Sequence, residues 1–393
     1  MRFFEPSSDP AEGLGVLMLF RLIEEAVPAF FRADRRILIA RAPGRLDVLG
    51  GLQTAVDAEA LQLPIAEAAC AAIQARDDDL VRLWSPCRDG SRTQLLSMRL
   101  HDLGLPGAGI DYEEARALFG GDPRDRWAGY LLGALLVLAR EHGLAPAHGA
   151  ELLVHSDVPE RCGVASSAAI TVAALRAFAL LYGLELSGEA LAAAYQRVEA
   201  EIQRAPHRRR DALAVAWASA GELLALRGEE LAARVVVPSD LEIVALDSGA
   251  PTTADDVAPD QAAAVVEPAA VTRFLALLAA EPTAANRHDL GDLLFAADDQ
   301  YVAAGRGDRA TDLIVAQARA RRDAGGSVFG AKTTGRGGGG TVLLLGEHGK
   351  VWYEALRIKK ALLQATGHSG HVFRWSSPGA LAFGSIELAP ARA

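Results

Sequence analysis

The sequence predicts an α+β protein with two domains, and three observations carry that prediction. Short apolar runs rich in Val, Ile and Leu are typical of strands, and they occur at 37–43, 151–159, 241–249 and 341–346. Longer segments between them repeat their apolar residues at helical spacing. Half of the 393 residues are hydrophobic and 23% are charged, which is enough apolar material for more than one core.

Strands and helices alternate in the first half of the chain. The strand at 37–43 is expected to end at a Pro-Gly turn, and the strand at 151–159 in a loop. That loop should open directly into a helix over about 168–183, because apolar residues recur there every three or four positions until a glycine stops the run. A second helix is expected from about Ser187. Its apolar stripe consists of Leu191, Tyr195, Val198 and Ile202.

The second half continues the alternation. The strand at 241–249 precedes an alanine-rich stretch that is expected to be helical over about 262–303, and the buried strand at 341–346 leads into a last long helix. The pattern is weakest around 226–235, so the domain boundary is placed there. The prediction is a leader at 1–35, an N-terminal domain at 36–228 and a C-terminal domain at 229–393.

Composition and charge argue against several classes of function. A formal net charge of −10 disfavours a general affinity for nucleic acid or for an anionic membrane surface. No apolar run is long enough to span a bilayer, and the N-terminus lacks the basic and apolar segments of an export signal. Cys70, Cys87 and Cys162 are spaced for neither a disulfide framework nor a zinc site. A cytoplasmic location is therefore expected, with no nucleic-acid or membrane partner.

The segment PERCGVASSAA at 159–169 is the most informative of three glycine-bearing segments. Gly163 permits a tight backbone path, and the helix that follows adds the partial positive charge of its N-terminus, so the segment is suited to cradle phosphate. Ser166 and Ser167 add hydroxyls that can bond phosphate oxygens or ligate Mg²⁺. The alternative is an ordinary helix start capped by a serine.

Two further segments carry a similar signal. GAKTTGRGGGGTVLLLG at 330–346 has six glycines within eleven residues, a density that indicates close approach of the backbone to a phosphate or to another backbone. It lacks the Walker-A spacing, and no GxGxxG follows the first strand, so a P-loop NTPase or a Rossmann enzyme is disfavoured. RAPGRLDVLGGLQTAV at 41–56 sets Arg45 beside a Pro-Gly turn, where an arginine either bridges phosphate and carboxylate oxygens or forms a surface salt bridge.

In this order, the three segments resemble the three motifs of the GHMP kinases, most closely those of the sugar-kinase branch that contains galactokinase and L-arabinokinase. The resemblance extends to LQLPIAEA, SDVPERCGVASSAA, QRVEAEI and ATGHSGHVFRWSSPGALAFG, and it covers about 36–390. It implies the GHMP kinase fold, with the ATP and acceptor sites in the cleft between two α/β domains. It also implies a sugar kinase that uses ATP and Mg²⁺ to phosphorylate the anomeric hydroxyl of an L-arabinose-like, galactose-like or uronic acid substrate.

The resemblance further assigns roles to individual residues. Asp211 would be the base that accepts the proton of the sugar hydroxyl, and Arg45 would lie opposite it. Ser167 and Glu199 would ligate Mg²⁺. The acceptor sugar would contact Asp47, Gly51, Thr54 and Arg208. The ATP phosphates would be bound by Gly163, Val164, Ala165, Ser166, Ser167, Ala168, Gly335 and Gly337.

The sequence departs from the family pattern mainly on the acceptor side. Thr54 and Ala55 stand where related kinases have an Asp-Tyr pair, and Asp211 follows the basic run 207–210 instead of small residues. Arg161 lies in the segment 159–169, the predicted phosphate loop, at a position where related kinases have a glycine. One hypothesis is that the arginines of the basic run select an anionic sugar through contacts with its carboxylate. The alternatives are a non-sugar alcohol as acceptor and a catalytically silent nucleotide or sugar sensor.

Overall fold

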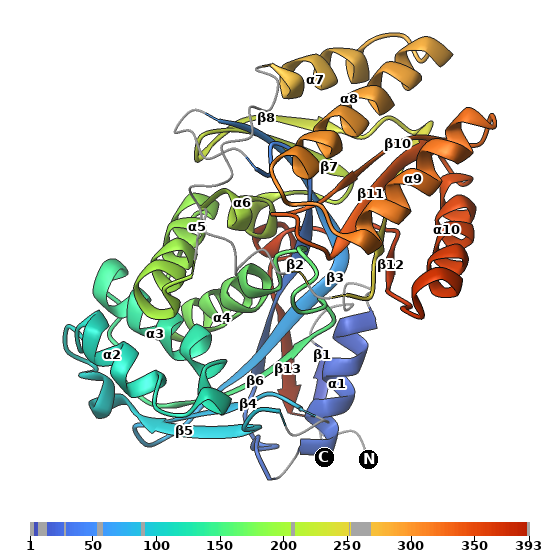
Figure 1. The fold of residues 1–393 in the computed structure, drawn as a ribbon. Helices are drawn as coiled ribbons and strands as arrows, with labels where there is room; N and C mark the ends of the chain where they lie inside the picture. The colour runs from blue at the N-terminus through green and yellow to red at the C-terminus, as the bar shows by residue number, and fades with distance from the viewer. Residues whose placement is uncertain are drawn as a thin grey trace.

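The computed structural model describes residues 4–6, 14–26, 29–52, 58–87, 91–205, 209–250, 252 and 269–390, which form two sheets flanked by helices (Figure 1). The larger sheet has the order β1 (Phe4–Pro6), β13 (Ile386–Pro390), β2 (Ile37–Leu49), β3 (Glu59–Ala75), β6 (Ala150–Ser156), β4 (Leu80–Trp84) and β5 (Leu95–Arg99). It also includes β7 (Glu222–Arg227), which pairs with β3, and β8 (Glu230–Val236), which pairs with β7. The smaller sheet has the order β10 (Val328–Thr333), β11 (Thr341–Glu347), β9 (Leu241–Asp247) and β12 (Val372–Phe373). The α+β class predicted from the sequence is confirmed.

The helices agree well with the predicted ones in the first half of the chain. α4 and α5 begin within two residues of the expected positions, and a π-helical segment follows α5 without a break. The helices are α1 (Leu14–Ala26), α2 (Tyr112–Phe119), α3 (Ala128–His142), α4 (Ser166–Tyr182), α5 (Gly188–Arg197), the π-helical segment Val198–Gln203, α6 (Arg209–Trp217), α7 (Ala270–Ala279), α8 (Ala284–Ala303), α9 (Arg309–Asp323), α10 (Val351–Thr366) and α11 (Ala380–Phe383).

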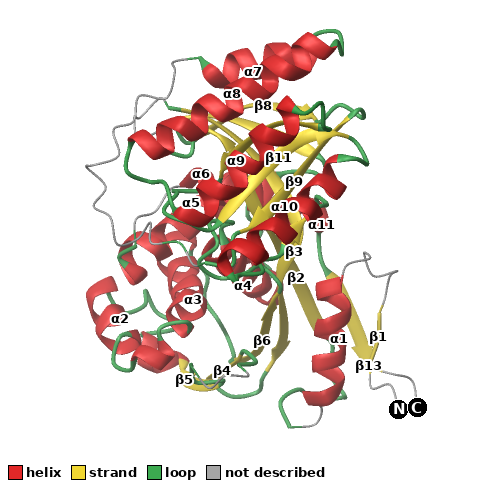
Figure 2. Cartoon of the chain, turned by 45° about the vertical axis from the view of Figure 1, so that its right-hand side comes forward, coloured by secondary structure: helices red, strands yellow, loops and turns green. Residues whose placement is uncertain are grey.

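The long central strands serve two separate cores. Successive side chains of a strand point to opposite faces of its sheet, so both faces of β3 need cover. Ala71 and Ile73 pack in the core that α3 and α4 cover, whereas Cys70 and Ala72 pack in the core of α1. Figures 1 and 2 show α3 and α4 on one side of the larger sheet and α1 on the other. The sheet is thus a layer between helices.

β2 is longer than the sequence predicts. It pairs with β3 from Leu38 to Leu49, and it passes the expected Pro-Gly turn by a shift of register between Pro43 and Arg45. Such a bulge places one extra residue in one strand and lets the ladder resume beyond it. A Cβ on Gly44 would lie 2.7 Å from the carbonyl oxygen of Val164, so the glycine allows close approach of the phosphate loop. Arg45 therefore projects from a strand and not from a turn.

The alanine-rich stretch predicted as one helix over 262–303 contains two. α7 ends at Ala279 and α8 begins at Ala284, and residues 262–268 lie outside the described residues. Pro282 disfavours helical backbone in the residue before it. Thr283 then accepts a hydrogen bond from the backbone N–H of Asn286 and caps the new helix. The break between α7 and α8 therefore has a local cause, which the spacing of apolar residues does not indicate.

The segment predicted as a leader contributes to the core. Val16, Leu19 and Ile23 of α1 are buried against the larger sheet. The predicted boundary between 228 and 229 falls in the turn between β7 and β8, both of which belong to that sheet. The division into domains at 36–228 and 229–393 stays a prediction. Both strands of the β7–β8 hairpin belong to the larger sheet.

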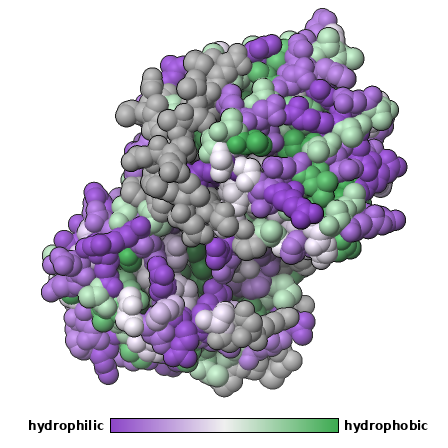
Figure 3. All heavy atoms as spheres, viewed as in Figure 1, coloured by the Kyte–Doolittle hydropathy of each residue, from purple (hydrophilic) through white to green (hydrophobic). Residues whose placement is uncertain are grey.

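The surface is largely polar where Figure 3 shows it. Hydrophilic residues cover most of the visible face, and hydrophobic residues occur in small groups between them. Among the described helices, none combines the length and the apolar character that a bilayer crossing requires.

Candidate active site

The structure brings the three glycine-bearing segments together. The backbone N–H of Arg45, in the first segment, donates to the carbonyl oxygen of Val164 at 3.0 Å, and its Nη1 donates to the carbonyl oxygen of Gly163 at 2.9 Å. A Cβ on Gly335, in the third segment, would lie 2.7 Å from that same oxygen of Gly163. Gly335 also has a φ of +71°, a conformation that favours glycine. Glycine at this position therefore allows the third segment to touch the second.

A pocket of about 610 Å³ opens at this junction. Most of the predicted site residues line it, namely Arg45, Gly163, Ala165, Ser166, Ser167, Glu199, Asp211 and Gly335. Val164 and Ala168 are buried behind the lining. Gly337 lies outside the lining, and a Cβ at this position would lie 2.7 Å from the carbonyl oxygen of Arg306, so glycine allows the third segment to approach Arg306 closely. Thr54 and Arg208 lie outside the described residues.

The phosphate loop ends at a helix N-terminus that faces the pocket. The N-cap of α4 is Ala165, with φ 62° and ψ 45°, and it has no side-chain cap within the described part of the chain. The structure thus differs from the alternative of a serine-capped start, since Ser166 is already the first helical residue. The first amides of a helix have no partner within it and carry partial positive charge, so they suit an anion.

The loop keeps a glycine-like backbone at non-glycine positions. Gly163 has a φ of 77°, and Arg161 and Ala165 adopt φ values of 57° and 62°. The left-handed region costs a residue with a Cβ roughly 1–2 kcal/mol. Arg161 and Ala165 therefore hold this path of the backbone at some energetic cost. The carbonyl oxygen of Arg161 accepts from the backbone N–H of Thr252 at 2.7 Å.

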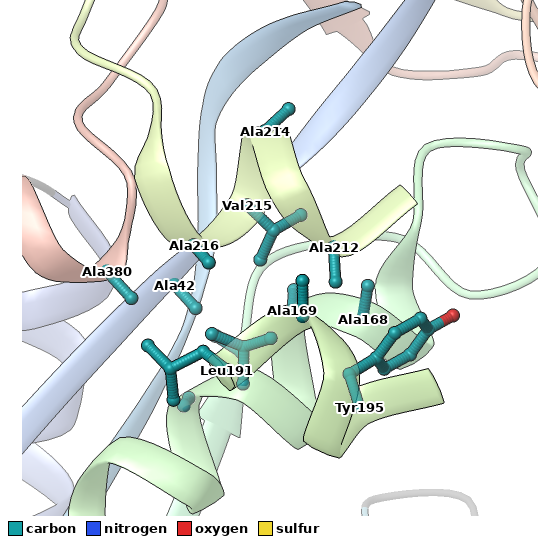
Figure 4. Close-up of a cluster of buried hydrophobic side chains, with 14 of the residues drawn as sticks. Ala42, Ala168, Ala169, Leu191, Tyr195, Ala212, Ala214, Val215, Ala216 and Ala380 are labelled. Carbon is teal, nitrogen blue, oxygen red and sulfur yellow. The ribbon is translucent and has the colours of Figure 1, made fainter. Parts of the chain in front are cut away.

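Close packing of small side chains positions the polar ones. Ala168 of α4 and Ala212 of α6 are fully buried, and Figure 4 shows them pointing toward each other beside Tyr195 of α5. Their neighbours in the chain are Ser167 and Asp211, so the contact between two alanines brings the hydroxyl-bearing turn of α4 and the acidic turn of α6 to one pocket. A larger side chain at either position would separate the two helices.

Tyr195 links the oxygen ligands predicted for Mg²⁺. Burial, followed by the charges of Glu199 and Asp211, raises the pKa of Tyr195 well above its usual value, and interaction of its hydroxyl with the side chain of Ser167 opposes this rise. Tyr195 therefore stays protonated and can act only as a neutral neighbour. In Figure 4 its hydroxyl points out of the apolar cluster.

Ser167 and Glu199 form a donor set that suits Mg²⁺. Glu199 is 3% exposed and lines the pocket from the π-helical segment, and Ser167 lines it from the first turn of α4. Mg²⁺ prefers oxygen ligands and usually takes one or two from the protein and the others from water and substrate phosphates. Among the described residues, no group of three His, Cys, Asp or Glu side chains gathers to hold a metal ion. The residues present therefore fit a metal shared with a phosphate substrate.

Asp211 is paired with a buried arginine. Nη2 of Arg45 donates to Oδ1 of Asp211 at 2.9 Å, and Nε2 of Gln62 donates to the same oxygen at 3.4 Å. Burial lowers the pKa of Arg45, but the charges of Asp211 and Asp47 outweigh burial and raise it, so the guanidinium stays charged. The side chain of Asp211 is 17% exposed, and it reaches the pocket from the first turn of α6. A carboxylate held in this way can accept a proton from a bound alcohol.

The described members of the predicted basic cluster contact the main chain. Arg210 is 4% exposed and donates to the carbonyl oxygen of Gly50 at 3.2 Å. Arg209 donates to the carbonyl oxygen of Glu189 at 3.4 Å. Neither arginine lines the pocket. The hypothesis that this cluster selects an anionic sugar therefore draws no support from Arg209 or Arg210.

Asp47 and Gly51, predicted to contact the acceptor, join the first segment to the third. The backbone N–H of Asp47 donates to Oγ1 of Thr334 at 2.6 Å, and Nζ of Lys332 donates to the carbonyl oxygen of Asp47 at 3.2 Å. A Cβ on Gly51 would lie 2.3 Å from the hydroxyl of Tyr301, which donates to Gly335. Asp47 and Gly51 do not line the pocket. Their contacts with the third segment and with Tyr301 support the wall of the pocket.

The burial of Lys332 predicts how the free energy of unfolding changes with pH. It is 1% exposed, and burial lowers its pKa to about 8, against the opposing charges of Asp47 and Asp298. Between pH 8 and 10.5 the unfolded chain then binds more protons at this site than the folded one, so the free energy of unfolding rises with pH. Relative to the Lys332→Met variant, wild type should gain about 2 kcal/mol between pH 7.5 and 9.5. Urea unfolding of both proteins at several pH values measures this, and a constant difference would contradict it.

Several residues of the site were missed by sequence reasoning. The spacing of Tyr195 places it in an apolar stripe, and only its hydroxyl distinguishes it from the aliphatic members. Met18 and Leu22 of α1 line the pocket from the segment predicted as a leader, and nothing in the sequence marks them. Trp127 and Tyr130 add an aromatic wall of the kind that can hold a nucleotide base. Trp127 is the N-cap of α3, and Tyr130 follows three positions later in the same helix. This spacing, which places both rings on one side of the helix, is the signal that the sequence offers.

Comparison with known proteins finds similarity to kinases. Residues 129–219 match the GHMP kinases N terminal domain. The chain is 27% identical to L-arabinokinase of Arabidopsis thaliana, over 93% of this chain and 48% of that protein. It is 32% identical to galactokinase of Chloroflexus aurantiacus, over 54% of this chain and 49% of that protein. The chain thus spans about half the length of the curated relatives it matches.

Solved structures extend the likeness to nearly the whole fold. The structure of Lactococcus lactis galactokinase complexed with galactose superimposes with a TM-score of 0.76 and 17% identity, covering 92% of this chain and 99% of that one. Methanococcus jannaschii mevalonate kinase gives a TM-score of 0.61 and 19% identity, over 86% and 98% of the two chains. At these identities the likeness concerns the fold.

Proposed function

The chain carries a GHMP kinase N-terminal domain and the GHMP kinase fold, and from that premise we propose a sugar kinase that transfers the γ-phosphoryl group of ATP to the anomeric hydroxyl of a monosaccharide. One observation carries the proposal. A single pocket is lined by a helix N-terminus, two glycine-bearing loops and a carboxylate paired with a buried arginine. This set combines anion binding with a proton acceptor.

The transfer step follows from the roles of Asp211 and Arg45. The carboxylate of Asp211 accepts the proton of the sugar hydroxyl, and the hydroxyl oxygen forms a bond to the γ-phosphorus. The bond from that phosphorus to the β,γ-bridging oxygen breaks, and ADP leaves with the electron pair. Arg45 holds the carboxylate ionised and adds positive charge close to the transferring group. In such reactions, positioning and charge stabilisation supply most of the acceleration.

The remaining residues bind and orient the nucleotide. The amides of the phosphate loop and the first turn of α4 face the ATP phosphates, with Ser166 close by. Ser167 and Glu199 would hold a Mg²⁺ ion, which would neutralise charge on the β- and γ-phosphate oxygens. Trp127 and Tyr130 give the base an apolar wall, and α1 closes that end of the pocket.

The likeness to L-arabinokinase and galactokinase supports a sugar as acceptor. An anomeric hydroxyl is more acidic than an ordinary alcohol, so one carboxylate and one arginine suffice for its activation. We propose L-arabinose, D-galactose or a related uronic acid as the acceptor class, with a sugar 1-phosphate as the product.

The acceptor is tested by ADP release with Mg-ATP in the presence of L-arabinose, D-galactose, D-galacturonate or D-glucuronate. One sugar is expected to raise the rate well above that without sugar, and NMR of the product should place the phosphate on C1. Comparison of the neutral with the acidic sugars also tests the hypothesis of anion selection. Silence across the panel, with ATP binding intact, would instead favour a non-sugar alcohol or a sensor.

A further inference from the structure

Gln62 is a buried polar residue beside the pocket that the proposed reaction does not yet use. It lies on β3, where it is paired with Asp47 of β2 on one side and with Leu224 of β7 on the other. It is 0% exposed, and its neighbours Leu61 and Leu63 are buried as well. A carboxamide in the middle of a fully paired strand needs a reason, because buried polar groups are costly unless they are hydrogen-bonded.

The two polar atoms of the Gln62 side chain differ in their contacts with the described residues. Nε2 donates to Oδ1 of Asp211 at 3.4 Å, the oxygen that also accepts from Nη2 of Arg45 at 2.9 Å. Oε1 is buried and has no hydrogen-bond partner among the described residues. An unsatisfied carbonyl lowers stability, and an apolar side chain of the same size would avoid that cost. The contact with Asp211 is therefore what this residue contributes.

We propose that Gln62 is a positioning residue that holds Oδ1 of Asp211 together with Arg45. Two donors on one carboxylate oxygen restrict rotation of the carboxylate more than the arginine alone. The amide is neutral, so it favours the ionised carboxylate without adding a second positive charge that would weaken it as a base. This inference rests on the proposed function, in which Asp211 is the base.

The test compares Gln62→Met and Gln62→Glu with wild type. Loss of the amide donor in Gln62→Met should move the acid limb of the kcat/KM profile to higher pH by about half a unit to one unit. Gln62→Glu places a second carboxylate beside Asp211 and should move the limb further in the same direction. The KM for ATP should change little. L-Arabinose serves as the probe, or the sugar of the acceptor panel that gives the fastest ADP release. Profiles that coincide with wild type would overturn the proposal.

Gln74 provides a matched control on the same strand. It is also buried, but it is hydrogen-bonded at both ends, to the backbone N–H of Arg32 and to the carbonyl oxygens of Arg32 and Arg35. Gln74→Met should lower the urea midpoint and leave the pH profile unchanged. Gln62→Met should do the opposite, with an equal or higher midpoint and a shifted profile. A lowered midpoint with an unchanged profile for Gln62→Met would mean a purely structural role.

A second measurement does not depend on turnover. Free energies of unfolding from urea titrations at pH 7 of wild type, Gln62→Met, Asp211→Ala and the double variant form a cycle in which the two changes should be non-additive, since each single change removes the contact between the two side chains. Additivity would overturn the contact. If Asp211→Asn retains full turnover, the proposed base is wrong whatever the cycle gives. If Asp211→Asn is inactive and the cycle is additive, only the role of Gln62 is wrong.

Discussion

Replacing Asp211 by asparagine is expected to lower kcat by about a thousandfold, because the amide cannot accept the proton of the sugar hydroxyl. The KM for ATP should change little, since the proposed contacts with the ATP phosphates come from the phosphate loop and the first turn of α4 and not from Asp211. Asparagine preserves the shape of the side chain, and its oxygen can still accept from Arg45. Steady-state ADP release at saturating acceptor, together with ATP binding by calorimetry, measures both effects.

Glu151→Gln is the matched control for Asp211→Asn. Glu151 is a carboxylate with 3% exposure on β6, and it accepts hydrogen bonds from Arg76 and Arg82 outside the pocket lining. Its replacement breaks a similar arginine pair and should lower stability, but kcat should stay within about twofold. If Asp211→Asn kept a turnover comparable to this control, Asp211 would not be the base.

Replacing Arg45 by methionine should produce the second large effect, a loss of about 10³-fold or more in kcat. The guanidinium of Arg45 donates a hydrogen bond to the carboxylate of Asp211, and it also donates to the carbonyl oxygen of Gly163 in the phosphate loop. Its removal leaves the carboxylate beside an apolar side chain, so we also expect a loss of about 3 kcal/mol in the free energy of unfolding. Kinetics must therefore be measured well below the melting temperature of the variant.

Arg41→Met separates the catalytic effect from the structural one. Arg41 is a buried arginine on the same strand, and it donates to Oγ of Ser377 and to the carbonyl oxygen of Ala66. Its replacement should destabilise the protein through lost hydrogen bonds and should leave kcat nearly unchanged. Equal losses of kcat in Arg41→Met and Arg45→Met would show that the strand, and not the guanidinium of Arg45, is responsible.

Local signals in the sequence predicted much of the fold. The end of α4 at Gly183 and the start of α5 after Ser187 were correct because apolar spacing, a glycine in left-handed conformation and a serine cap act over a few residues. The phosphate loop was recognisable for the same reason. β2 is longer than predicted because a bulge after Pro43 lets its pairing with β3 continue beyond the expected turn. That pairing depends on the partner strand and not on the local sequence.

Contacts between distant segments were beyond prediction from residue patterns. Gln62 and Asp211 are 149 positions apart, and Lys332 and Asp47 are 285 apart. Each contact exists because two strands or loops are packed side by side, and neither partner carries a local sign of the other. Tyr195 belongs to the same class, since its spacing predicted burial correctly but could not reveal Ser167 at the end of its side chain.

The backbone at Glu199 has a consequence for alignments of related chains. Its segment, Val198–Gln203, is a π-helix, in which each backbone hydrogen bond joins residues five positions apart instead of the four of an α-helix. Deletion of a single residue there would restore the α-helical pattern and rotate one flank relative to the other by about 100°. The carboxylate would then leave the pocket although the glutamate was retained. A one-residue gap in this segment would therefore mark the loss of the proposed metal ligand, which a comparison of residue types alone would miss.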